Sequence, residues 1–209
     1  MPGEFYDTLG EISGYAMELG DSIRDTQLTI GNALVHGLEI DRNGNVILIY
    51  GTESDRTFRV DYRFRISNHL PVSDEEVQEH ADGLGGIDVD LNQLQATIRK
   101  QKLERIDESE REDAFASAKA EAEQIETGIQ WLTYEDEGSD LWDGFVIQTR
   151  LYPYSSDFGI KRYNETMKQV VGDGVPIAST IFESLDVLGQ EQAPELSEAE
   201  QSSHSRTYQ

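Results

Sequence analysis

Residues 58 to 66 read Phe58-Arg59-Val60-Asp61-Tyr62-Arg63-Phe64-Arg65-Ile66, an unbroken alternation of apolar and charged side chains. Successive side chains of a β-strand point to opposite faces of the sheet. The five apolar residues therefore share one face, and the four charged residues share the other. A strand with one buried and one polar face is typical of an antiparallel sheet.

The sequence before this stretch predicts two more strands and a helix. Asp41 to Asn45 holds the pair Asn43-Gly44, which is typical of a hairpin turn, and residues 46 to 51 follow it as a strand. Residues 28 to 40 carry apolar side chains of one parity, which favours one strand with bulges at Gly31 and Gly37, although a helix over 27 to 35 stays open. Apolar residues at spacings of three and four predict a helix over residues 5 to 23.

After this meander, Ser73 and Glu76 match a capping box that opens a short helix. A long helical stretch is expected over 91 to 129, either as one helix or as two that divide near Asp107 to Arg111. Two strands follow at 131 to 134 and 145 to 152, around an acidic turn. A helix from residue 160 is expected to end at Gly172-Asp173-Gly174, and another to begin at Val175-Pro176 and reach residue 188.

These elements predict an α+β fold in a single domain over residues 1–188. Its order is a helix, a three-stranded antiparallel meander, a long helical segment, a two-stranded hairpin and C-terminal helices. Residues 189–209 are rich in Gln, Glu and Ser, and we expect them to form a disordered tail.

The composition is strongly acidic: 41 Asp and Glu stand against 17 Lys and Arg, a formal net charge of -24. Only five of the basic residues are lysines. A carboxylate-rich, lysine-poor surface resembles that of a haloarchaeal protein, because multimolar salt screens the self-repulsion of such a chain. The acidity counts against nucleic acid as a partner, since phosphate contacts need a positive surface.

The absence of cysteine excludes disulfides, thiolate metal sites and cysteine nucleophiles. No apolar run reaches the roughly 18 residues of a membrane span, and the first residues lack an apolar signal region, so we expect a cytoplasmic protein without a membrane partner. Two stretches that begin at Asp41 and Asp88 imitate a calcium loop, but each lacks its glycine and its final glutamate. No catalytic, metal or cofactor site is therefore predicted.

Basic residues gather at two places. Arg59, Arg63 and Arg65 occupy the polar face of the strand described first, and Arg99, Lys100, Lys102 and Arg105 lie on the long helical stretch. Arginines in such a row are typical of a docking surface for carboxylates, but acidic residues of neighbouring elements also commonly neutralise strand arginines.

Aromatic residues gather in and beside the second hairpin, where they fit either an interface or ordinary strand packing. The candidate partner-binding residues from the basic and aromatic groups together are Arg59, Arg63, Arg65, Arg99, Lys102, Arg105, Trp142 and Tyr152.

The element order is similar to the α+β fold of type III secretion chaperones and of the YbjN-like proteins that share it. The stretch Phe145-Val146-Ile147-Gln148-Thr149-Arg150-Leu151-Tyr152-Pro153-Tyr154, followed by a helix over 158 to 171, resembles the last strand and helix of small prokaryotic members. This resemblance implies a non-enzymatic, dimer-forming module that binds segments of other proteins, with no catalytic residues to carry over. The stretches 91–129 and 176–188 depart from that pattern.

The leading hypothesis is thus a cytoplasmic, non-enzymatic protein-interaction module of a halophile, chaperone-like or an adaptor, whose protein partner is unknown and which forms a dimer. One alternative is a structural or assembly component of a halophilic virus or other large particle. A third is an enzyme that uses a carboxylate-bound metal.

Overall fold

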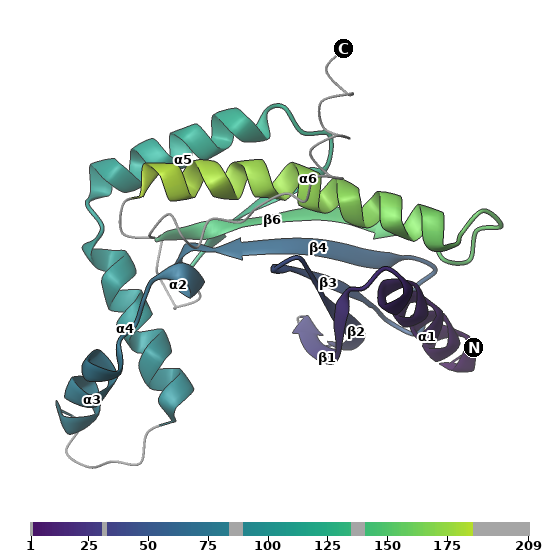
Figure 1. Ribbon diagram of the computed structural model, residues 1–209, viewed down its shortest axis with the longest axis horizontal. Coiled ribbons are helices and arrows are strands. Elements are labelled where there is room, and N and C mark those ends of the chain that lie inside the picture. Colours follow the sequence, from purple (N-terminus) through teal and green to yellow (C-terminus); the bar gives the residue numbers. More distant parts are fainter. Residues whose placement is uncertain (1, 31–32, 84–89, 135–140, 186–209) are drawn as a thin grey trace.

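The fold is α+β, as the sequence predicts, and its sheet has six antiparallel strands in the order β1-β2-β3-β4-β6-β5. The computed structural model describes residues 2–30, 33–83, 90–134 and 141–185 (Figure 1). The strands are β1 (Ser22–Ile30), β2 (Ala33–Arg42), β3 (Asn45–Gly51), β4 (Phe58–Arg65), β5 (Gly128–Thr133) and β6 (Trp142–Leu151).

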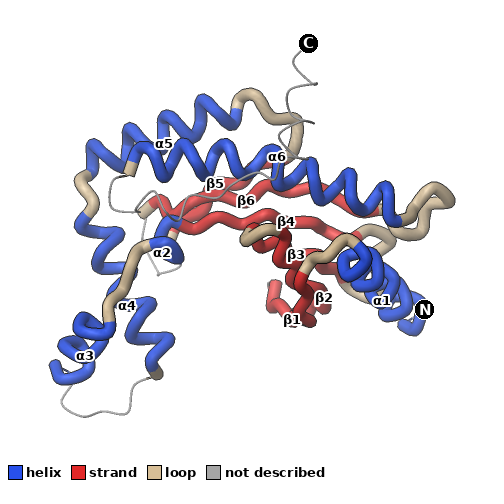
Figure 2. Tube along the Cα trace, in the orientation of Figure 1, coloured by secondary structure: helices blue, strands red, loops and turns tan. Residues whose placement is uncertain are grey.

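Helices cover one face of this sheet. α1 (Pro2–Glu18) lies over β1 and β2, and α6 (Ile160–Ser184) runs along β4 and β6 (Figure 2). α5 (Glu108–Ala122) packs against α6. α2 (Ile66–His69), α3 (Asp74–Gly83) and α4 (Leu91–Arg105) form an arm beyond the end of β4 (Figure 1).

The main core lies between the sheet and the layer formed by α1 and α6. Alternate residues of β4 enter it, and Phe58, Val60, Tyr62 and Phe64 are at most 3% exposed. On α6 the buried positions recur every three or four residues, as expected for an amphipathic helix. These positions are Tyr163, Thr166, Met167, Val170, Val171, Gly172, Gly174, Val175, Ile177, Ala178, Ile181 and Phe182.

The first part of the sheet differs from the sequence-based prediction, because residues 28 to 40 do not form a single strand. β1 and β2 are two strands of a hairpin in which Ile30 pairs with Ala33, so the meander has four strands and the whole sheet six. The N-terminal helix accordingly ends at Glu18, and Ile23 belongs to β1. The pairing runs without a register shift through Gly37, so the bulge predicted there is absent, while Gly31 lies outside the described residues.

The C-terminal helix also differs, because α6 is one helix of 25 residues and continues through Gly172-Asp173-Gly174 and Pro176. Gly174 sits against the buried ring of Tyr62, and a Cβ atom at this position would lie 2.3 Å from Cδ1 of that ring. This glycine therefore allows close approach of the helix to β4, where the sequence pattern indicated a helix end.

The predicted capping box is confirmed, and of the two forms left open for the long helical stretch the structure has the second. The hydroxyl of Ser73 accepts from the amide of Glu76 at 3.2 Å, and the Glu76 carboxylate accepts from the amide of Ser73 at 2.8 Å, which is a capping box. The long helical stretch is two helices, α4 and α5, and Asp107 between them caps α5 by accepting from the amide of Ser109. The stretch ends before Ile129, which lies in β5. Residues 189–209, the predicted tail, lie outside the described residues.

Within the described ranges, no helix is long and apolar enough to cross a membrane.

Candidate functional site: an arginine-bearing sheet face

The second face of the sheet carries the charged side chains of β4 and is covered by none of the described helices (Figures 1 and 2). The register brings residues of β6 beside them: Arg59 is paired with Arg150, and Asp61 with Gln148. On the other side β3 places Tyr50 beside Arg59. Together with Arg63, these residues form what we call the arginine face.

Arg59 and Arg150 stand directly opposite each other on neighbouring strands, and both are exposed. Like charges in this position destabilise a sheet, by up to about 1 kcal/mol. Among the described residues neither guanidinium has a carboxylate within ion-pair distance. The sheet therefore holds two arginines together, and no carboxylate of the described ranges neutralises either of them.

A buried carboxylate organises the centre of the arginine face. Asp61 is 0% exposed and accepts hydrogen bonds from the hydroxyl of Tyr50 at 2.8 Å, from Arg63 at 3.2 Å and from Gln148 at 3.4 Å. Through these three hydrogen bonds Asp61 positions the side chains of Tyr50, Arg63 and Gln148. The Arg63 side chain remains 40% exposed while it makes this bond. The arginine face thus carries three guanidinium groups and one carboxylate, and its net charge is positive.

The hydroxyl of Tyr50 lies where these charges meet. Burial raises the pKa of Tyr50, and the charge of Asp61 and the hydrogen bond to it raise the pKa further. A hydrogen bond with Arg59 and the charge of Arg63 act in the opposite direction. Tyr50 therefore stays protonated at neutral pH and serves as a fixed donor to Asp61.

Apolar side chains continue the same face toward the first hairpin. Val35, Leu48 and Tyr50 form a small cluster with the partly buried Leu28, separate from the main core. Ile30, on the same face at the end of β1, is 41% exposed. The second face of the sheet is thus positively charged at β4 and β6, while toward the first hairpin it carries apolar residues and the Arg24–Glu39 ion pair.

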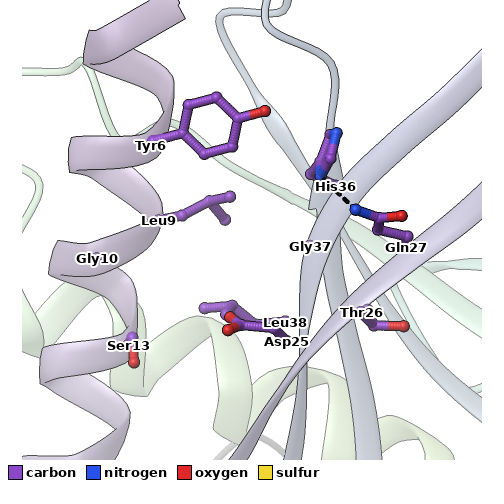
Figure 3. A pocket seen from close by; sticks show the side chains of 10 residues that line it. All are labelled: Tyr6, Leu9, Gly10, Ser13, Asp25, Thr26, Gln27, His36, Gly37 and Leu38. Atoms are coloured by element: carbon purple, nitrogen blue, oxygen red, sulfur yellow. Dashed lines mark hydrogen bonds between the residues drawn. The ribbon is translucent and has the colours of Figure 1, made fainter.

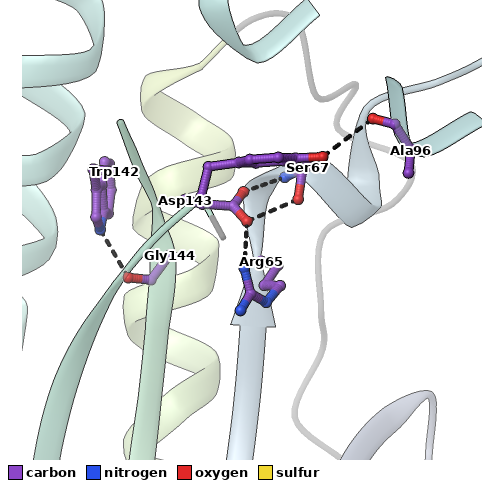
Figure 4. Close-up of polar contacts among 7 residues, drawn as sticks. Arg65, Ser67, Ala96, Trp142, Asp143 and Gly144 are labelled. Atoms are coloured by element: carbon purple, nitrogen blue, oxygen red, sulfur yellow. Dashed lines mark hydrogen bonds and ion pairs between the residues drawn. The ribbon is translucent and has the colours of Figure 1, made fainter. Parts of the chain in front are cut away.

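Arg65, the third arginine of the predicted row, is not free for a partner. It donates to Asp143 of β6 at 2.9 Å, and Asp143 also accepts from the amide and hydroxyl of Ser67 at 2.8 and 2.9 Å (Figure 4). Asp143 is 0% exposed. This ion pair fixes the start of α2 to β6, so the role of Arg65 is structural.

The second basic cluster lies on α4, away from the arginine face (Figure 1). Lys102 donates to Glu76 of α3 at 2.8 Å and to the carbonyl of Pro71, so this lysine ties α3 to α4. Nε of Arg99 is buried and lacks a hydrogen-bond partner. Arg105 is exposed at the end of α4. These three residues do not extend the row on β4.

A histidine beside this arm should make folding stability depend on pH. Burial lowers the pKa of His69, the charge of Arg99 lowers it further, and Asp143 opposes them. The unfolded chain then binds a proton more readily, so this contribution to stability is present above about pH 6.5 and is lost as the pH falls through the folded pKa. The ring stacks on Phe64 at 4.9 Å and meets Phe182 edge-on at 5.2 Å, so His69→Phe should keep the packing.

We expect His69→Phe to flatten the loss of stability between pH 7 and 5, measured by urea unfolding at constant KCl. A His80→Gln variant on α3 serves as the control and should keep the wild-type dependence. Equal pH slopes in His69→Phe and wild type would show that His69 does not carry the effect.

The two aromatic candidates, Trp142 and Tyr152, differ in their exposure. Trp142 is half-buried against Phe115, with ring centroids 4.7 Å apart, and its indole N–H donates to the carbonyl of Gly144 at 2.8 Å. It therefore joins α5 to β6 within the fold. Tyr152, just past β6, is 52% exposed.

The sequence did not reveal a groove between α1 and the first hairpin (Figure 3). Its volume is about 560 Å³, within the range of ligand pockets. His36 and Gln27 lie 3.4 Å apart on its strand side, and Tyr6 faces His36 from the helix, with ring centroids 5.6 Å apart. In this groove Gln27, His36 and Tyr6 already contact one another, whereas Arg59 and Arg150 on the arginine face have no carboxylate within ion-pair distance among the described residues.

Three or more histidine and carboxylate side chains do not come together as a metal site anywhere in the described ranges. The predicted acidic turn at 135–140 lies outside those ranges.

No family model and no curated protein matches the chain. Among solved structures, the chain is similar to the crystal structure of an uncharacterized protein from Methanothermobacter thermautotrophicus. The identity is 12%, the alignment covers 85% of this chain and 99% of that chain, and the TM-score is 0.49. The candidate site therefore rests on the geometry described above.

Proposed function

We propose that the protein is a non-enzymatic interaction module, chaperone-like or an adaptor, that captures acidic segments of partner proteins on the arginine face. The observation that carries this proposal is the Arg59–Arg150 pair. Two exposed guanidinium groups on adjacent strands cost stability, and a carboxylate bound between them removes that cost.

The chemistry of the face favours carboxylates carried on a protein segment. Arginine's planar fork binds a carboxylate through two parallel hydrogen bonds, and Arg63 adds a third, partly exposed guanidinium. Ile30, which continues the same face at the end of β1 and is 41% exposed, offers a place for an aliphatic side chain. A segment that combines glutamates with an apolar residue satisfies both halves of the face.

The overall charge of -24 sets the conditions under which such a partner is bound. An acidic segment is repelled at long range by the rest of the molecule, and salt screens this repulsion beyond about 8 Å at 0.15 M. Contacts at the face itself are shorter than this distance. A salt-rich cytoplasm, which we propose as the setting, therefore suits the interaction.

We expect Arg59→Glu to weaken binding while it stabilises the fold. The substitution turns a repulsive cross-strand pair into an attractive one, in which the introduced carboxylate faces Arg150, and this should raise the free energy of unfolding by about 0.2–1 kcal/mol. The same change places a carboxylate where the partner's carboxylate binds. Affinity for a fluorescein-labelled peptide of alternating Glu and Leu should fall about tenfold, which corresponds to 1.4 kcal/mol.

Fluorescence anisotropy and urea unfolding at one KCl concentration measure the two effects. Lys161→Glu makes the same charge change at a side chain that is 89% exposed on α6, and it should alter the affinity less than twofold. A Gln-for-Glu version of the peptide should bind neither protein. Equal affinities of the Arg59→Glu and Lys161→Glu proteins for the acidic peptide would remove the arginine face from the proposal.

A further inference from the structure

The sequence beyond α6 has the chemistry that the arginine face fits. Residues 186–209 hold five acidic side chains, Asp186, Glu191, Glu195, Glu198 and Glu200, and one arginine, Arg206. Leu196 stands among three of these glutamates. The same chain thus contains an acidic stretch with an aliphatic residue in it, which is the kind of segment proposed above as a partner.

The end of α6 lies within reach of the face. Phe182, in its last turn, packs against Phe64 near the end of β4, with ring centroids 5.7 Å apart. Glu195 lies ten positions beyond Leu185, and an extended chain over ten positions spans up to about 35 Å. Five strand positions from Phe64 back to Arg59 cover about 17 Å, and passing from one face of a sheet to the other takes about 10 Å more.

We propose that residues 191–200 bind to the arginine face of their own chain and compete there with the acidic partner segment. This inference rests on the proposed function and adds a regulatory contact to it. The carboxylates of Glu195, Glu198 and Glu200 pair with the exposed guanidinium groups, and Leu196 contacts the exposed Ile30 at the end of β1. A partner binds by displacing this segment.

Tethering gives the internal segment its strength as a competitor. A short linker holds a segment at an effective concentration in the millimolar range, so a weak contact is still largely occupied. A segment that would bind with a dissociation constant of about 0.1 mM when untethered lowers the apparent affinity for a partner about tenfold. Weakening the internal segment should therefore strengthen partner binding.

The first test uses the full chain with Glu195→Gln, Glu198→Gln and Glu200→Gln. Its affinity for the Glu/Leu peptide should rise about tenfold over wild type. The control variant carries Glu79→Gln, Glu112→Gln and Glu123→Gln, three exposed positions on α3, α5 and the residue after α5, and removes the same charge. This control should raise the affinity less than twofold.

The second test measures whether the segment lies close to the arginine face. Because the chain has no cysteine, Ala199→Cys accepts a single nitroxide label. The label should broaden the amide signals of Leu48 and Gln148 in the full-length protein, and Arg59→Glu together with Arg150→Glu should remove this broadening.

The outcomes separate the inference from the function on which it rests. If the Gln variant binds the peptide no more tightly than its control and the label broadens no signal of the face, the inference is overturned, while Arg59-dependent peptide binding stands. If the label broadens these signals but neither wild type nor the Gln variant binds the peptide, the internal contact is supported and the proposed function falls.

Discussion

Gly144→Ala should lower the free energy of unfolding by about 3 kcal/mol or more, because two costs combine at this position. Gly144 has φ +136°, a backbone conformation that L side chains rarely adopt. A Cβ atom built here would lie 2.1 Å from the carbonyl oxygen of Phe64 on β4, and this neighbour is backbone that cannot turn away. The strands β4 and β6 would have to separate where Arg65 and Gly144 are paired.

Urea unfolding against Gly10→Ala provides the comparison. Gly10 lies within α1 and has nothing within 4 Å of an added Cβ atom, so the same substitution there should stabilise the protein by about 0.5–1 kcal/mol. A Gly144→Ala protein that unfolds at the wild-type urea concentration would contradict the described pairing of β4 with β6.

Asp143→Ala should cost about 2–4 kcal/mol of stability. The substitution removes the acceptor for three donors at once, namely Arg65 and the amide and hydroxyl of Ser67 (Figure 4). The Ser67 groups are buried and lose their partner, whereas the Arg65 side chain is 21% exposed and recovers some hydration. The larger part of the loss therefore comes from the start of α2.

Asp113→Ala, an exposed aspartate within α5, is the matched control and should change stability by less than about 0.5 kcal/mol. Adding Arg65→Met to Asp143→Ala removes the charge that lost its partner and should recover part of the loss. Asp143→Ala with wild-type stability would show that this buried ion pair does not hold α2 to the sheet.

The parts of the fold that could be predicted are those with a strong local pattern. The alternation in residues 58 to 66 gives β4 and assigns its two faces correctly, because strand geometry alone determines them. The first hairpin was missed because most of the apolar residues before and after its turn have even numbers. They therefore look like one face of a single strand. Leu28 points to the second face and Leu38 to the core, and only the pair Gly31-Asn32 between the strands indicates the reversal.

α6 shows the opposite difficulty. Glycines at 172 and 174 and the proline at 176 resemble a helix end and a helix start, and local chemistry favours that interpretation. Packing decides otherwise, since Gly174 receives the ring of Tyr62 from a strand more than a hundred residues away. The residues around Gly174 in the sequence therefore do not indicate this contact.

The sequence likewise predicted only part of the candidate site. Arg59 and Arg63 were placed on the polar face of their strand, and they remain there. Arg150 can be assigned to this face only from the register between β4 and β6. Likewise, the ion pair that makes Arg65 structural joins it to Asp143, 78 residues later in the sequence. A register and a long-range ion pair are properties of the tertiary structure, so neither pattern nor composition reveals them.

Chemical-shift mapping of the acidic peptide on the isotope-labelled protein tests the proposed function most directly. Titration with the Glu/Leu peptide should shift amide signals in the middle of β3, β4 and β6, centred on Tyr50, Arg59 and Gln148, and Arg59→Glu should abolish these shifts. Shifts centred instead on Arg105 of α4 or on the groove between α1 and the first hairpin would contradict binding at the arginine face.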